Sequence, residues 1–188
     1  YCMISAKRVR FVTDYTLQPI PAKTLSRRLP EGTALVLEGG GLRGYYSCGV
    51  MEAFMEKDLL FPYIIGVSAG AANALSYISG QPGRSREIIE HYVGNPDYVS
   101  TRNLLTKHTM FDFDYIFGTV PEKHIFFDWD KFHEQDARFL TGAMNCADGK
   151  TVWFEKDTLK APFMASRASC SVPLITKIQH YMGYDLLD

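Results

Sequence analysis

Residues 34–44 read Ala34-Leu-Val-Leu-Glu-Gly-Gly-Gly-Leu-Arg-Gly44, a short apolar run that leads directly into a glycine-rich loop. A continuous apolar run of this length is typical of a strand that is buried on both faces of a parallel sheet. Apolar residues then recur at helical spacing over residues 45–57. The order strand, glycine loop and helix predicts the first unit of an α/β fold.

A second unit of the same kind follows at once. Residues 61–65 predict another buried strand, Gly66-Val-Ser-Ala-Gly70 forms the next loop, and residues 71–78 continue as a helix that ends at Gly80. Two successive strand–loop–helix units imply parallel strands covered by helices. We therefore expect a three-layer α/β/α sandwich with a mostly parallel central sheet.

The remaining patterns are shorter. They predict a helix over residues 86–93, a hairpin over 139–154 that turns at Asp148-Gly149, a small-residue helix over 160–171 and paired short strands over 177–187. The segment 109–139 is dense in aromatic and acidic residues and predicts no definite element. We expect it to form a lid, a pocket rim or part of the core.

Composition limits the class of protein. The chain has 188 residues, of which 46% are hydrophobic and 22% charged, so one domain with a full core is expected over residues 33–188. Residues 1–32 carry three prolines and an excess of basic residues, which predicts an irregular lead-in. The net charge of −1 argues against nucleic acid as a partner. Aromatic residues make up 13%, which suits either an apolar ligand or a Phe-rich core.

Location and cofactors follow from what the sequence contains. The four cysteines have no metal-ligand spacing and predict reduced thiols in a cytoplasmic protein. No apolar run approaches the roughly 18 residues of a membrane span, so any membrane contact is expected to be peripheral. No metal or other cofactor is expected, because the aspartates of segment 109–139 alternate with aromatic residues and do not follow a calcium-loop pattern. The sequence does not set the oligomeric state.

The glycine loop allows three interpretations. Gly39, Gly41 and Gly44 match the GxGxxG pattern of dinucleotide-binding folds, but the second strand ends in Gly66-Val-Ser68 and not in the acidic residue that binds ribose. The same glycines also fit a tight turn without a ligand. In the third interpretation, their amides at a helix N-terminus donate hydrogen bonds to an oxyanion.

The second loop matches GxSxG between a strand and a helix, which is the setting of a nucleophile elbow. Gly66 and Gly70 would permit the sharp turn that exposes the hydroxyl of Ser68. The alternative is that Ser68 merely caps the next helix. Adjacent parallel strands would bring both loops to the same edge of the sheet, which favours an acyl-transfer site.

Together these two loops resemble the motifs of the patatin-like phospholipase family. The resemblance of the chain to this family extends over residues 35–188. The resemblance implies Ser68 as nucleophile, with Gly66 and Gly70 forming its elbow. It also implies an oxyanion loop formed by Gly39, Gly40, Gly41, Arg43 and Gly44. Residues 165–173 resemble the small-residue helix of the family that runs into a proline, and Tyr184-Asp-Leu-Leu-Asp188 resembles the approach to its catalytic aspartate. The glycines that follow this aspartate in the family would come after Asp188, so we expect the natural chain to continue.

The choice of base has alternatives. A Ser-His-Asp triad would need one of five histidines, none of which lies in a recognisable motif: His91, His108, His124, His133 and His180. The resemblance implies a Ser-Asp dyad with Asp188 as the base, and Asp185 is the second candidate. The expected function is therefore lipid acyl hydrolysis. A catalytically silent lipid-binding module and a nucleotide-binding domain remain the alternatives.

Overall fold

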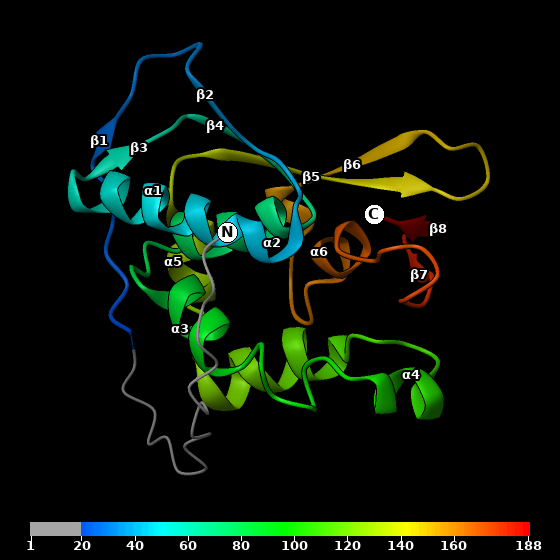
Figure 1. Ribbon diagram of the computed structural model, residues 1–188. Coiled ribbons are helices and arrows are strands. Elements are labelled where there is room, and N and C mark those ends of the chain that lie inside the picture. Colours follow the sequence, from blue (N-terminus) through cyan, green and yellow to red (C-terminus); the bar gives the residue numbers. More distant parts are fainter. Residues whose placement is uncertain (1–19) are drawn as a thin grey trace, which may run out of the picture.

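The computed structural model describes residues 20–188 and has a mixed α/β fold built around a six-stranded sheet (Figure 1). The strands lie in the order β2-β4-β5-β8-β7, and β6 pairs with β5. Their bounds are Ala34–Leu37 for β2, Tyr63–Val67 for β4, Arg138–Asn145 for β5, Thr151–Glu155 for β6, Gln179–Tyr181 for β7 and Tyr184–Leu187 for β8. The pairs β2–β4 and β4–β5 are parallel, and the strands beyond β5 are antiparallel. The expected α/β fold with a mostly parallel central sheet is confirmed.

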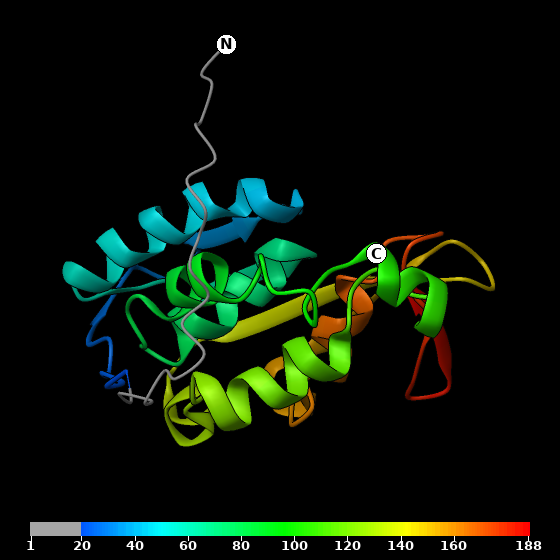
Figure 2. The same ribbon diagram turned by 60° about the horizontal axis from the view of Figure 1, so that its bottom comes forward.

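The helices supply the second layer. Their bounds are Tyr45–Glu56 for α1, Ala69–Ile78 for α2, Arg84–His91 for α3, Thr101–Lys107 for α4, Trp129–Glu134 for α5 and Met164–Ser169 for α6. Two short 3₁₀-helices are η1, Gly41–Gly44, and η3, Lys156–Thr158, and a π-helix, η2, spans Tyr115–His124. Figure 2 shows η2, in light green, lying across the helical side of the molecule. No helix in residues 20–188 is long and apolar enough to cross a membrane.

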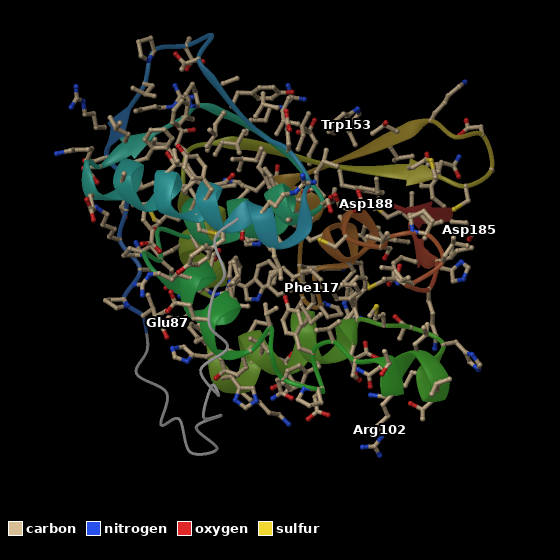
Figure 3. The ribbon with its side chains drawn as sticks, in the orientation of Figure 1. Glu87, Arg102, Phe117, Trp153, Asp185 and Asp188 are labelled. Carbon is tan, nitrogen blue, oxygen red and sulfur yellow. The ribbon has the colours of Figure 1, made fainter. Side chains whose placement is uncertain are left out.

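The two faces of the sheet differ in burial. Paired residues Ile64 and Phe139 have no exposed surface and belong to the main core under the helices. On the opposite face Val36 is 64% exposed and Trp153 is 46% exposed, and Figure 3 shows Trp153 on the side away from the helices. Within the described residues, the helices therefore form one of the two helical layers expected of a sandwich.

Most predicted elements occur with shifted ends. The strand expected over 61–65 is Tyr63–Val67, because Pro62 lacks the N–H that a ladder requires, and the separate strand β3, Leu59–Leu60, precedes it. The helix expected over 86–93 begins at Arg84, and the one expected over 160–171 is shortened to Met164–Ser169. The hairpin of β5 and β6 and the pairing of β7 with β8 are present as predicted. The helices α4, η2 and α5 were not predicted.

Part of the expected lead-in can be described. Residues 1–19 lie outside the described residues, whereas residues 20–32 pack on the domain. The side chain of Leu25 is 2% exposed, and its backbone N–H donates to Gln135 Oε1 at 3.2 Å. Strand β1, Arg27–Arg28, pairs in parallel with β3. This stretch therefore contributes to the core next to α1.

Candidate active site

Ser68 occupies the sharp turn between β4 and α2. Its φ of 53° is in the left-handed region, which is strained for a residue with a side chain. A Cβ at Gly66 would lie 2.6 Å from Ala71 Cα, and one at Gly70 would lie 2.3 Å from the carbonyl oxygen of Leu37. Only glycine fits at these two positions, so the turn has the geometry of a nucleophile elbow.

The hydroxyl of Ser68 faces a carboxylate. Ser68 holds the N-cap position of α2, but its side chain makes no capping hydrogen bond. Instead, Oγ donates to Asp188 Oδ2 at 2.6 Å. Asp188 directly follows β8, which pairs with β5, and β5 in turn pairs with the strand that leads into Ser68. The sheet therefore brings together two residues that are distant in sequence.

The environment of Asp188 favours proton acceptance. Burial raises the pKa of its carboxyl above the ordinary aspartate value, and the hydrogen bond from Ser68 partly offsets this rise. A raised pKa makes the carboxylate a stronger base towards a hydroxyl. Asp185, the second candidate, lies at the outer edge of the molecule and contacts His180 (Figure 3). The structure thus brings Asp188, and not Asp185, to Ser68.

The glycine loop adjoins Ser68. A Cβ at Gly39 would lie 2.9 Å from Ser68 Cβ, so the loop and the elbow are in direct contact. Gly40 and Gly41 line the same cavity as Ser68, and both have positive φ. The side chain of Arg43 folds back and its Nε donates to the carbonyl of Gly40 at 3.5 Å.

The last glycine of the loop has a different place. Gly44 is buried against α2, where its carbonyl accepts a hydrogen bond from Asn73 Nδ2 at 3.1 Å. It does not belong to the lining of the cavity. Gly44 therefore fixes the loop to α2, whereas Gly39 contacts Ser68 and Gly40 and Gly41 line the cavity.

A cavity of about 510 Å³ extends from the Ser68–Asp188 pair. Its wall is mostly apolar and includes Leu75, Ile88, Val99, Phe111, Phe117 and Phe163. Such a volume and lining are typical of a site that takes a small apolar ligand or an acyl chain. The aromatic segment 109–139 supplies part of this wall, while its Phe127 and Phe132 are buried in the core.

The histidines lie elsewhere. All five are among the described residues, and none lines the cavity. His133 stacks on Trp129, and His91 forms an ion-pair contact with Glu87. In residues 20–188 no three His, Cys, Asp or Glu side chains gather closely enough to hold a metal ion.

One part of the site was not predicted from the sequence. The backbone N–H of Ser68 donates to Ser169 Oγ at 2.7 Å, and the backbone N–H of Asp188 donates to the carbonyl of Ser171 at 2.8 Å. The sequence marked residues 165–173 only through a family resemblance. The serines of this small-residue helix were the only signal in the sequence, and they did not indicate which residues they would contact.

Comparison with known proteins places these features in a family. The model of the patatin-like phospholipase family matches residues 35–188. The chain is 33% identical over 102 residues to "Uncharacterized protein YjjU" of Escherichia coli, covering 54% of this chain and 29% of that protein. It is 37% identical over 82 residues to a patatin-like phospholipase domain-containing protein of Cryptococcus neoformans, covering 43% of this chain and 9% of that protein. The chain thus spans less than a third of the length of either relative. Because the family model covers most of the sequence, including both loops and Asp188, the chain belongs to the patatin-like phospholipase family.

Proposed function

We propose that this chain is a lipid acyl hydrolase that cleaves carboxylic esters with a Ser-Asp dyad. The observation that carries the proposal is the 2.6 Å hydrogen bond from Ser68 Oγ to Asp188 Oδ2 at one end of an apolar cavity. Membership of the family supports lipid hydrolysis in general. The specific reaction and the roles of the residues are our proposal.

The reaction would run in two halves. Asp188 accepts the proton of Ser68 Oγ as this oxygen attacks the ester carbonyl carbon, which forms a tetrahedral oxyanion. Backbone amides near Gly40 and Gly41 would donate to the oxyanion, and one such donor is typically worth about 10²–10³ in rate. The C–O bond then breaks, and the alcohol leaves with the proton from Asp188. In the second half, Asp188 takes a proton from water as the water oxygen attacks the acyl-enzyme. The acyl–Oγ bond then breaks, Asp188 returns the proton to Ser68 Oγ, and the fatty acid is released.

Product analysis tests this function directly. We expect the protein to release fatty acid from at least one of phosphatidylcholine, lysophosphatidylcholine and triacylglycerol, and a fluorophosphonate to label Ser68. The preferred lipid identifies the substrate class. Folded protein that neither hydrolyses a lipid nor reacts with the fluorophosphonate would support a silent lipid-binding module instead.

Peripheral contact with a lipid surface is part of the proposal. Leu42 and Val172 line the cavity and are still 62% and 38% exposed. Leu174, two residues further on, is 97% exposed at a φ of 72°. Its turn is held by the bond from Thr176 Oγ1 to the carbonyl of Val172, at 2.9 Å. An apolar side chain presented by a fixed turn beside the cavity suits insertion into lipid.

Replacing Leu174 with serine should therefore weaken binding to lipid vesicles. Withdrawing one leucine from an apolar environment costs about 1.5–3 kcal/mol, so we expect about tenfold or greater loss of vesicle binding by flotation. Hydrolysis of a short soluble ester should not change, because Leu174 does not line the cavity. Met182→Ser is the matched control, since Met182 is also exposed at a positive φ but lies in the turn between β7 and β8. Equal vesicle binding by both variants and the wild type would rule out this surface.

A further inference from the structure

A single stretch of chain, residues 169–171 at the end of α6, contacts both members of the dyad. Ser169 Oγ accepts the backbone N–H of Ser68 at 2.7 Å. Two residues later, the carbonyl of Ser171 accepts the backbone N–H of Asp188 at 2.8 Å. Both serines are completely buried, so water does not compete for these bonds. The spacing of two residues therefore links the position of the nucleophile to that of the base.

The elbow needs such support. Ser68 has a φ of 53°, and strained backbone persists only where surrounding contacts hold it. The β4–β5 ladder ends at Val67, which pairs with Gly142, so the N–H of Ser68 finds its partner outside the sheet. The partner side chain comes from a helix that is 101 residues away in sequence.

We propose that Ser169 is a positioning residue, whose hydroxyl holds Ser68 at the angle from which Oγ reaches Asp188. This inference rests on the proposed function, because it assigns a role within that dyad. Ser169 does not line the cavity and so does not contact the substrate. Its effect on the reaction must therefore pass through Ser68.

The first test is the kinetics of Ser169→Ala on a short soluble ester. Removing the hydroxyl leaves the buried N–H of Ser68 without its acceptor and frees the elbow to shift. Because a misplacement of about 1 Å can cost about 10²-fold in rate, we expect kcat to fall by about 10–100-fold. KM should change little, since the cavity wall is intact. Ser169→Thr, which keeps the hydroxyl, should restore most of the activity.

The pH profile separates positioning from general damage. The hydrogen bond from Ser68 lowers the pKa of Asp188, so a loosened pair should raise this pKa and move the acidic limb of kcat/KM to higher pH. Within residues 20–188, the thiol of Cys170 also interacts with Asp188, and burial raises the pKa of this thiol. The Cys170 thiol stays neutral across the acidic limb and does not contribute to it.

Ser166→Ala is the matched control. Ser166 lies on the same helix and is fully buried, but its hydroxyl has no hydrogen-bond partner among residues 20–188. It should keep wild-type kcat and pH profile. Equal losses in Ser166→Ala and Ser169→Ala would assign both effects to packing and overturn the inference. Wild-type kcat and pH profile in folded Ser169→Ala would overturn it as well.

A measurement that does not depend on ester hydrolysis tests the role of Ser169 independently of the proposed function. Amide hydrogen exchange at Ser68 should be faster in Ser169→Ala than in Ser166→Ala or the wild type, because only the first variant lacks the acceptor. Unchanged exchange would contradict a supporting role for the hydrogen bond from the Ser68 N–H to Ser169 Oγ, even if the enzyme is active. A wild-type protein that hydrolyses no ester would contradict the proposed function. The exchange result would still show whether Ser169 holds the backbone of Ser68.

Discussion

Ser68→Ala should reduce ester hydrolysis to near background, a loss on the order of 10⁴–10⁶-fold in kcat. The substitution removes the oxygen that attacks the carbonyl carbon, and among the described residues no other hydroxyl of the cavity lining donates a hydrogen bond to Asp188. Fatty acid release from the preferred lipid measures the effect. Fluorophosphonate labelling should disappear in parallel, because the same oxygen forms that bond.

Stability should change little in this variant. Alanine at position 68 meets the same positive φ that serine already tolerates, and the side chain makes no cap to α2 that could be lost. Thermal unfolding of Ser68→Ala beside the wild type provides the check. Wild-type turnover in a folded Ser68→Ala protein would contradict the proposed mechanism, and a large loss of stability would make Ser68 a structural residue.

The two loops could be predicted because their signals are local. A strand that runs into Gly66-Val-Ser-Ala-Gly70 and then into a helix constrains the backbone within a few residues. The structure gives both glycines of the elbow a contact that explains them: a Cβ at Gly66 would meet Ala71, and one at Gly70 would meet the carbonyl of Leu37. The parallel pairing of β2 with β4 then places both loops at one edge of the sheet, as expected from two successive units.

The hydrogen bond between the Ser68 N–H and Ser169 Oγ could not be predicted, because it joins two segments that are distant in sequence. Nothing near Ser169 in the sequence indicates that its hydroxyl meets the N–H of Ser68. The helices of segment 109–139 were missed for a related reason. Phe127 packs in the core, whereas Phe113 lines the cavity. The apolar residues of the segment therefore face two different surfaces and do not recur with the period of a single helix or strand.

Asp188→Asn should lower kcat by about 10²–10⁴-fold, the usual contribution of a positioned general base. Asparagine keeps the shape of the side chain and can still contact Ser68, so folding and fluorophosphonate access should be retained. The amide cannot take the proton of the hydroxyl, so the nucleophile is no longer activated. Kinetics on a short soluble ester, with thermal unfolding as a check on the fold, would measure this loss.

The pH dependence of hydrolysis also tests Asp188 as the general base. Hydrolysis needs the ionised carboxylate, so activity is present above the pKa of Asp188 and is lost as the pH falls through it. Burial raises this pKa, and the acidic limb of kcat/KM should therefore lie above the ordinary aspartate value in the wild type. In Asp188→Asn, the residual activity should lose that limb.

Two controls decide between a dyad and a triad. Asp185→Asn and His180→Gln alter the other acid–base pair near the end of the chain, whose side chains contact each other. The side chain of His180 is 76% exposed, so both variants should keep activity close to that of the wild type. A large loss in His180→Gln, with Asp188→Asn still active, would point to a histidine base. The present geometry argues against that outcome, because Asp188 bonds directly to Ser68 Oγ and leaves no histidine between them.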